Sequence, residues 1–366
     1  MKVGRVFGFE IRVDPSWFII FVLMAYTLSV GFFPEAVRGL APAGYWVLGL
    51  VASLLLFSSV LLHELSHSLV GRSQGMEIAG ITLFIFGGVA RLKSEPRSPR
   101  VEIWMTLAGP AMSFLLSGLF LLLSRIALLG PAGHALFAYL SFINLALAVF
   151  NLLPGFPLDG GRVLRATLWW ALGDLQRATW FASLAGQGIG LTLLALGVMA
   201  MLTQGLGGLW LAFIGWFVLT AARQSYQQLV LQEALVGVEV GRVMDEGYPH
   251  VPPDLSVLDL VTGYLVRLGI RQVPVVEEDR PLGMVGLDEV RALAPALWGA
   301  TSVGEVMTPL DREVLIGEHE DAWHAIRQLS ESGAGRLLVL RQGRVVGTVS
   351  RETLANLLEL RLRATT

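Results

Sequence analysis

The sequence predicts a polytopic α-helical membrane protein with about six transmembrane helices and a small membrane-associated β-hairpin or sheet, followed by a cytosolic α/β region. Three observations support this fold class. The 366 residues are 54% hydrophobic and only 15% charged, whereas soluble proteins carry about 25% charged residues. The apolar residues gather in runs long enough to cross a bilayer. Beyond residue 225, charges become frequent and short strand and helix patterns alternate.

Composition also limits the chemistry. The chain contains no cysteine, which excludes structural disulfides, thiolate metal ligands and a cysteine nucleophile. The net charge of −2 gives no reason to expect nucleic acid as a partner. Of the six histidines, only His63 and His67 lie within an apolar segment. A metal site in the membrane must therefore combine these two with Asp, Glu or water.

The elements follow in order from the N-terminus. Residues Gly4 to Val13 alternate like a strand and precede a first span that we expect to remain uncleaved. The expected spans are Trp17–Phe33, Tyr45–Val70, Val101–Leu129, Ala135–Leu153, Trp180–Leu202 and Leu209–Ala222. The third is expected to break at Gly109-Pro110. Between the second and third spans, Ile78–Leu83 and Gly87–Leu92 predict two short strands.

Charge asymmetry orients these spans. Basic residues follow the second, fourth and sixth spans, among them Arg72, Arg162 and Arg223. The positive-inside rule therefore places these connections in the cytosol. An even number of spans agrees with two cytosolic termini. The sequence thus predicts a multi-pass protein of the cell membrane, embedded in the lipid bilayer, with cytosolic N- and C-termini.

The most informative motif, His63-Glu64-Leu65-Ser66-His67, lies near the end of the second span. Residues four apart share one face of a helix, about 6 Å apart along the axis. Two imidazoles so placed can bind one zinc ion, and Glu64 can take a proton from a water that the metal activates. The alternative is a chance occurrence on a surface helix. Charged groups at membrane depth cost roughly 2.5 kcal/mol or more, so this polar trio needs an internal partner.

A second polar motif follows the fourth span, from Asn151 to Arg162. Its two prolines and three glycines predict a helix break, which at membrane depth must be buried in protein or line a water-filled cavity. Asp159 in this break can supply a third zinc ligand, because catalytic zinc keeps three protein ligands and one open position. Asn151 can hold the substrate carbonyl or its developing oxyanion. Alternatively, Asp159 is a turn or helix-cap residue.

Together the motifs at His63–His67 and Asn151–Gly161 resemble those of the site-2 protease family of intramembrane zinc metalloproteases. The resemblance implies that His63, His67 and Asp159 hold one zinc ion per chain. It implies that Glu64 is the catalytic acid–base and that Asn151 assists. The implied activity is cleavage of a peptide bond within or beside the transmembrane helix of a single-span membrane-protein substrate, near the cytosolic side.

One position departs from the family pattern. The family often has Asn shortly after a Gly-Pro in the third span, and here Ser113 stands there. We expect this difference to alter a helix contact and no catalytic role.

The strand pair suggests how a helical substrate is held. A helix hides its peptide bonds behind backbone hydrogen bonds, so the substrate must unwind, and an exposed strand edge can then pair with it. The residues expected to contact substrate are Ile78, Gly87, Gly88, Val89 and Arg91. A structural hairpin that covers the site is the equal alternative.

Two segments of the C-terminal region repeat each other, as Gln272–Val276 and Arg336–Leu340 illustrate. Such a repeat predicts two related modules that pack together. The modules resemble cystathionine-β-synthase (CBS) domains, which implies a regulatory role, an adenine nucleotide ligand and a homodimer through the CBS domains. In CBS modules a Ser or Thr and an Asp hold the ribose. Ser350 and Thr353 occupy these places in the second module, whereas Gly286 and Glu289 occupy them in the first.

The expected domains are a transmembrane zinc metalloprotease domain over 1–225, a linker over 226–237, and CBS domains over 238–300 and 301–366. Two other functions remain open at this point. A CBS-regulated ion transporter or channel could use intramembrane His, Asp and Glu as an ion path, although no repeat among the spans supports a carrier. An inactive scaffold of the same fold is the other alternative, and the intact motif opposes it.

Overall fold

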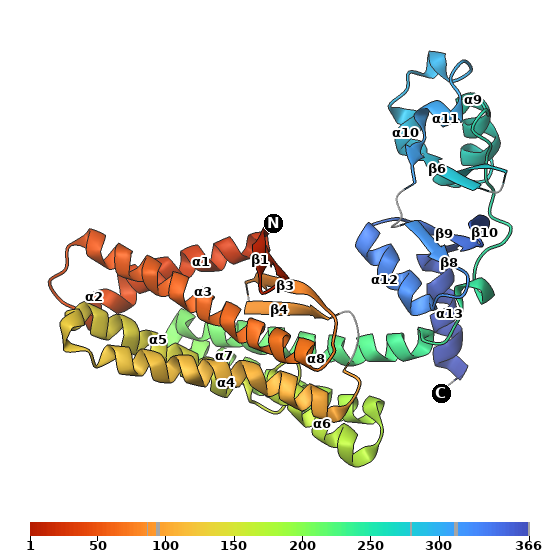
Figure 1. Ribbon diagram of the computed structural model, residues 1–366. Helices are drawn as coiled ribbons and strands as arrows, with labels where there is room; N and C mark the ends of the chain where they lie inside the picture. Colours follow the sequence, from red (N-terminus) through yellow and green to blue (C-terminus); the bar gives the residue numbers. More distant parts are fainter. Residues whose placement is uncertain (86, 93–95, 279, 311–313, 365–366) are drawn as a thin grey trace. The chain divides into compact units, whose positions relative to one another are not determined.

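The chain is described by a computed structural model that covers residues 1–85, 87–92, 96–278, 280–310 and 314–364. Its contacts divide it into two compact units, Met1–Leu229 and Val230–Thr366 (Figure 1). The expected linker over 226–237 lies mostly within α8 (Leu209–Leu235), a helix that begins in the first unit. Each unit is described by itself.

The first unit is mainly helical. Its other helices are α1 (Pro15–Thr27), η1 (Leu28–Phe32), α2 (Phe33–Ala36), α3 (Pro42–Ser73), α4 (Pro99–Ser124), η2 (Ala127–Leu129), α5 (Gly130–Asn151), α6 (Asp159–Leu172), α7 (Leu175–Gln204) and η3 (Gly205–Gly208). Within the described residues, five helical stretches are long and apolar enough to span a membrane. They correspond to the first five expected spans, and the sixth corresponds to the start of α8.

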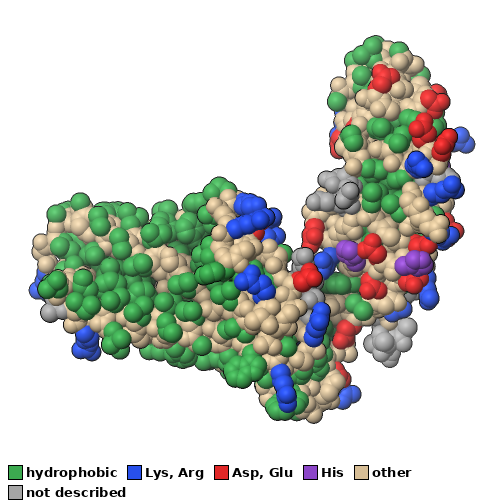
Figure 2. Space-filling view, viewed as in Figure 1, with side chains coloured by type: hydrophobic (Ala, Val, Ile, Leu, Met, Phe, Trp, Pro, Cys, Tyr) green, Lys and Arg blue, Asp and Glu red, His purple; other side chains and the backbone are tan. Residues whose placement is uncertain are grey.

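The surface of this unit fits a lipid environment. Figure 2 shows hydrophobic side chains over most of its visible face, with Lys and Arg gathered mainly toward the end that carries the strands. The expected break in the third span is wrong, because α4 runs continuously through Pro110. Membrane helices tolerate proline where neighbouring helices compensate for the lost backbone hydrogen bond, and α4 packs against both α3 and α5.

A four-stranded sheet accompanies the helices. Its order is β1 (Lys2–Val6), β2 (Phe9–Val13), β3 (Ile78–Phe84) and β4 (Gly87–Leu92). The two strands expected between spans two and three are confirmed. The single N-terminal strand is instead a hairpin, which turns at Phe7 and Gly8 with φ of 49° and 85°. β2 pairs with β3 in parallel, so β4 is left as an edge of the sheet.

The sheet packs onto the part of α3 that carries the histidine motif. Phe9, Ile11 and Val13 of β2 share a buried cluster with Ile81 of β3 and Leu65 of α3. Leu65 lies between the two histidines in sequence and faces the sheet. This contact turns the opposite side of α3, with His63 and His67, toward α4 and α6.

The second unit contains two three-stranded sheets. Its elements are η4 (Val240–Arg242), α9 (Val257–Leu260), η5 (Val261–Val266), β5 (Gln272–Glu277), β6 (Arg280–Gly286), α10 (Leu287–Arg291), η6 (Pro295–Leu297), α11 (Val303–Val306), β7 (Thr308–Pro309), β8 (Leu315–Gly317), α12 (Ala322–Ser332), β9 (Arg336–Arg341), β10 (Arg344–Ser350) and α13 (Arg351–Ala364). One sheet has the order β5-β6-β7 and the other β10-β9-β8. The repeat seen in the sequence is therefore a repeat of structure.

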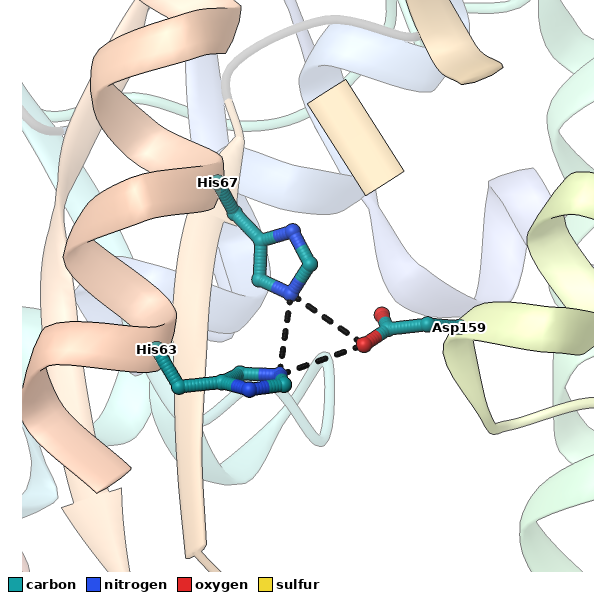
Figure 3. Close-up of side chains that lie close together, drawn as sticks. All are labelled: His63, His67 and Asp159. Atoms are coloured by element: carbon teal, nitrogen blue, oxygen red, sulfur yellow. Dashed lines mark hydrogen bonds and ion pairs between the residues drawn. The ribbon is translucent and has the colours of Figure 1, made fainter. Parts of the chain in front are cut away.

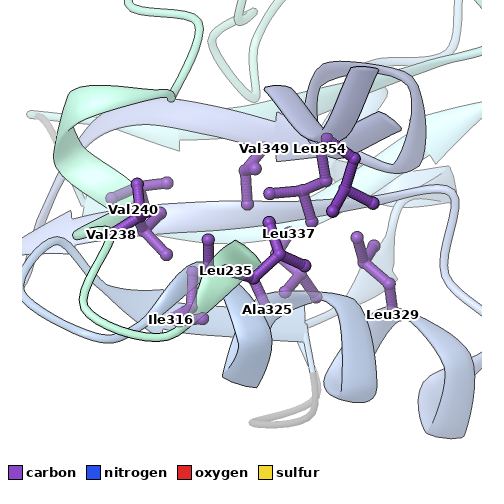
Figure 4. Packing of buried hydrophobic residues seen from close by; sticks show 12 residues of the cluster. Leu235, Val238, Val240, Ile316, Ala325, Leu329, Leu337, Val349 and Leu354 are labelled. Carbon is purple, nitrogen blue, oxygen red and sulfur yellow. The ribbon is translucent and has the colours of Figure 1, made fainter. Parts of the chain in front are cut away.

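The two modules exchange short segments. Leu235, Val238 and Val240, which lie at or just before the start of the first repeat, are buried in the core of the second module (Figure 4). In return, Val303 of α11 belongs to the buried core of the first module. The chain segment at the start of each repeat thus contributes to the core of the other module.

Candidate metal centre and active site

Three side chains converge between α3 and α6. His63 and His67 lie one turn apart on α3 and are 3% and 8% exposed, and Asp159 reaches toward them from the first residue of α6 (Figure 3). The two Nε2 atoms lie 3.1 Å apart. Asp159 Oδ2 lies 3.2 Å from each of them. In the described part of the chain, these three side chains are a group whose ligand atoms could hold a metal ion.

The spacing of these atoms fits a zinc ion. A tetrahedral zinc site with bonds of about 2.0–2.1 Å separates its ligand atoms by about 3.3 Å. The observed separations of 3.1 to 3.2 Å match three corners of such a tetrahedron. Two imidazoles and one carboxylate are also typical ligands of catalytic zinc, which leaves the fourth corner open. The residues present therefore fit the metal.

The other ring nitrogen of each histidine has a partner on α4. His67 Nδ1 lies 2.8 Å from the backbone oxygen of Met105, and His63 Nδ1 lies 2.8 Å from Ser113 Oγ. Both contacts leave Nε2 facing Asp159. Sequence reasoning missed Met105, and it treated Ser113 as a helix contact without a role at the site. No local pattern reveals these partners, because they lie 38 and 50 residues from the histidines.

Gly109 lies between these two partners on the same face of α4. A Cβ atom at Gly109 would lie 2.2 Å from His67 Nε2 and 2.6 Å from His63 Nε2. These distances are far below van der Waals contact, so only glycine leaves room for the two rings. Gly109 is therefore required by the close approach of the histidine pair to α4.

The break after α5 brings Asp159 to the site. Asp159 is the first residue of α6, and the residue before it, Leu158, makes no side-chain cap. Asp159 instead directs its carboxylate at the histidines, so its partners differ from those of a turn or cap residue. The break packs on α7, where Phe156 N donates to Ala182 O over 3.1 Å. A Cβ on Gly186 of α7 would lie 2.0 Å from Phe156 O.

A buried ion pair fixes α6 against α4. Arg165 of α6 donates to Glu102 Oε1 in the first turn of α4, through Nε at 2.9 Å and through Nη2. Glu102 is fully buried and Arg165 is 6% exposed. Arg162, one turn closer to Asp159, lies 3.7 Å from the same oxygen. Sequence reasoning assigned Arg162 and Arg165 only to membrane orientation and did not single out Glu102.

A cavity of about 500 Å³ opens onto the convergent side chains. His63, His67 and Asp159 line it together with Glu64 and Asn151. Of the residues expected to contact substrate, Ile78, Gly87, Gly88 and Val89 also line it. Its other described walls are mostly apolar side chains from α1, α3, α5 and α8. The cavity can therefore hold an apolar segment beside a polar, potentially metal-binding centre.

Arg91 is outside this lining. Its guanidinium lies 4.0 Å from Glu10 Oε1 on β2. Arg12 and Lys2, which also pair with Glu10, lower the pKa of that carboxyl to about 2. Glu10 is therefore charged near neutral pH. It attracts Arg91 from another strand of the same sheet, outside the cavity lining.

Ser350 and Thr353 lie at the start of α13. Ser350 Oγ accepts from Thr353 N over 3.2 Å, and the two hydroxyl oxygens are 3.0 Å apart. A separate cavity of about 450 Å³ lies in the second unit and is lined by other residues. They are Arg271, Gln272, Gly286, Leu287, Asp288, Glu289, Arg291, Gly333 and Gly335.

Comparisons with known proteins agree with this arrangement. The profile of peptidase family M50 matches residues 51–134 and 126–196, and that of the CBS domain matches 240–295 and 303–360. Rip3 of Mycobacterium tuberculosis is 36% identical over 98% of this chain and 93% of its own length. Protein sll0528 of Synechocystis is 33% identical over 98% of this chain and 95% of its own. Both are named as zinc metalloproteases.

A third relative is also similar over most of its length. The zinc metalloprotease MJ0392 of Methanocaldococcus jannaschii is 27% identical over 96% of this chain and 94% of its own. The solved site-2 protease from that organism is similar to 62% of this chain and 94% of its own, with 29% identity and a TM-score of 0.46. The transporter alternative is not favoured by these relatives. The chain belongs to peptidase family M50, the site-2 protease family, and is a multi-pass membrane zinc metalloprotease that carries a pair of CBS domains.

Proposed function

We propose that His63, His67 and Asp159 hold the zinc ion and that Glu64 is the acid–base of peptide hydrolysis. The observation that carries this assignment is the convergence of two Nε2 atoms and one carboxylate oxygen, 3.1 to 3.2 Å apart, on a cavity that Glu64 also lines. A bound zinc ion supplies a Lewis acid that polarises the scissile carbonyl and activates water.

The residues of the chain complete the chemistry. Glu64 takes a proton from the attacking water and passes it to the amine that leaves. Asn151, the last residue of α5, lines the same cavity and would donate a hydrogen bond to the oxyanion that develops on the substrate carbonyl. The apolar walls reduce access of bulk water, which strengthens both interactions.

The substrate we propose is the transmembrane segment of a single-span membrane protein, cleaved near the cytosolic side. β4 is an edge strand, and Gly87, Gly88 and Val89 line the cavity. A Cβ on Gly88 would lie 2.4 Å from Glu64 Cγ, so the backbone of β4 passes directly beside the acid–base. An unwound substrate that pairs with β4 as an added strand would present its peptide bonds there.

The decisive experiment compares wild type with Glu64→Gln, both purified in detergent. We expect equal zinc content, because Glu64 is outside the ligand set. We expect cleavage of a single-span substrate to fall by about 100-fold or more in the variant, because general acid–base catalysis supplies about 10²–10⁴-fold. A chelator should abolish wild-type cleavage. Cleavage by Glu64→Gln at the wild-type rate would refute the assignment of Glu64.

We propose that the chain lies in the cell membrane with both termini cytosolic, on the basis of the positive-inside rule. Because the chain contains no cysteine, a thiol reagent can label only the single cysteine that is introduced. An impermeant thiol reagent should label Leu128→Cys, in the connection between α4 and α5, in intact cells. It should label Gln224→Cys, next to Arg223, only after lysis. The reverse pattern would contradict this orientation.

For the CBS pair we propose an adenine nucleotide as regulatory ligand and a homodimer as the assembled state. The proposed ribose contacts are Ser350 and Thr353. The second location is the cavity lined by Arg271 and Arg291 together with Asp288 and Glu289, where the two arginines can contact a phosphate. Calorimetric titration of the full chain with AMP and ATP tests both locations. Loss of binding in Ser350→Ala supports the first, loss in Arg291→Ala supports the second, and no binding to wild type rejects the nucleotide.

A further inference from the structure

We propose that Ser113 is a positioning residue of the metal centre, which holds His63 in the tautomer that can bind zinc. The inference rests on the proposed zinc site and adds a residue to it. Met105, Gly109 and Ser113 are spaced four residues apart on α4, so they share one face of the helix. That face meets the two histidines of α3 in the order Met105 with His67, then Gly109, then Ser113 with His63.

The two histidines are held by unequal partners. A neutral imidazole carries a hydrogen on one nitrogen and a lone pair on the other, and a metal binds the lone pair. The partner of His67 Nδ1 is the backbone oxygen of Met105, 2.8 Å away. A carbonyl only accepts, so Nδ1 of His67 carries the hydrogen and Nε2 is free for the metal.

The partner of His63 Nδ1 is a hydroxyl oxygen, 2.8 Å away. Ser113 is fully buried and His63 is 3% exposed, so water cannot readily replace this partner. When Ser113 Oγ accepts from Nδ1, the lone pair of His63 is on Nε2, toward Asp159. The hydroxyl is the only part of Ser113 that distinguishes it from alanine, and it is the part that meets the ring.

A hydroxyl can also donate to Nδ1, but zinc on Nε2 requires the hydrogen on Nδ1, and without Ser113 Oγ this buried N–H would lose its acceptor. The hydrogen of His63 would move to Nε2, where Asp159 Oδ2 lies 3.2 Å away and can accept it. That hydrogen bond occupies both a ligand nitrogen and a ligand oxygen of the proposed site. Ser113 thus acts against a state in which two of the three ligands bind each other instead of zinc.

The chain offers a matched control one turn along the same helix. Ser117 is 8% exposed and its Oγ donates to Ser141 O over 2.8 Å. Ser117→Ala therefore removes a buried, hydrogen-bonded hydroxyl from α4 without touching a histidine. His63→Ala tests the zinc site itself, and Ser113→Thr restores the hydroxyl.

The experiment measures zinc affinity of the full-length protein in detergent, by competition with a chromophoric chelator. We expect Ser113→Ala to weaken zinc binding about 10–100-fold, the range found when the hydrogen-bond partner of a ligand histidine is lost. Ser113→Thr and Ser117→Ala should bind zinc like wild type. If Ser113→Thr fails to fold, the comparison of Ser113→Ala with Ser117→Ala decides.

Equal affinities for Ser113→Ala and Ser117→Ala would overturn the proposal, as would a folded Ser113→Thr that binds as weakly as Ser113→Ala. In either case His63→Ala still shows whether the zinc site is correct, because that variant should lose zinc. Wild-type affinity in His63→Ala would instead overturn the proposed zinc site on which this inference rests.

Discussion

Gly109 sets the strictest requirement on any single residue of the metal centre. A Cβ at this position would lie within 2.6 Å of both Nε2 atoms, which are the atoms that face Asp159. We therefore expect Gly109→Ala to displace the histidines and to lose bound zinc, as measured by metal analysis of purified protein.

Gly118→Ala is the matched control, because it adds the same methyl group to α4 where nothing lies within 4 Å. It should retain zinc at the wild-type level. Equal zinc content in the two alanine variants would show that the imidazole rings of His63 and His67 can move to accommodate a Cβ at position 109.

Residue patterns predict the site only where the chemistry is local in sequence. Helical spacing predicts that His63, Glu64 and His67 lie together. Asp159 is predicted because it stands in a polar helix break, which at membrane depth must be buried in protein or line a cavity. Ser113 and Met105 could not be found in this way. Serine is common in membrane helices, and a backbone oxygen has no sequence signal at all. Arg91 stays a predicted substrate contact, but its position in β4 did not reveal that its guanidinium lies 4.0 Å from Glu10 Oε1.

At the scale of elements, the Glu102–Arg165 pair ties α6 to α4. Removal of one partner of a buried pair leaves an uncompensated charge, which costs about 3–5 kcal/mol. We expect Glu102→Ala to destabilise the protein by this amount and to weaken zinc binding, because α6 carries Asp159. Thermal unfolding in detergent and zinc competition measure the two effects.

The double variant Glu102→Ala with Arg165→Met removes both charges and should be more stable than Glu102→Ala alone. If the double variant is less stable than Glu102→Ala, the explanation by an unpaired, buried arginine fails.

The contact between α7 and the break before α6 gives a second prediction at this scale. A Cβ on Gly186 would lie 2.0 Å from Phe156 O, whereas a Cβ on Gly188 of the same helix meets nothing within 4 Å. We expect Gly186→Ala to push the break away from α7, which lowers zinc affinity and peptide cleavage. Gly188→Ala should leave both unchanged, and similar losses in the two variants would contradict this role of the break.

Elements formed by nearby residues were predictable, and those that depend on distant pairing were not. Two strands around Gly87 follow from local composition. The N-terminal hairpin required a turn with a positive φ at Phe7, which is uncommon outside glycine. Its parallel pairing joins Glu10 to Gly80 across 70 residues, and strand alternation alone does not identify such a partner.

At the scale of the whole molecule, the exchange of segments between the CBS modules places Leu235 in the buried core of the second module. Leu235 is fully buried, whereas its neighbour Val236 is 48% exposed. We expect Leu235→Ala to destabilise the second module by about 2–5 kcal/mol, measured by hydrogen exchange of β9 in the full chain. Val236→Ala should leave exchange unchanged, and equal protection in both variants would mean that Leu235 is dispensable to this core.

The repeat predicted two modules, but not the exchange between them. Sequence similarity aligns Val243 with Val306 and thereby groups each segment with the repeat that follows it. The structure instead buries Val303 among residues of the first module. Which core an apolar segment joins depends on the path of the chain between the modules, and a repeat alone does not determine that path.

The distribution of the three convergent side chains over α3 and α6 also governs when the centre can form. Asp159 is 92 residues later in the chain than His67 (159 − 67 = 92). A ribosome that adds about 5–20 residues per second needs about 5–18 s to cover that interval. During this time the histidine pair is already made while its carboxylate partner does not yet exist. The three side chains can therefore converge only after residue 159 has been made, when less than half of the 366-residue chain has been synthesised.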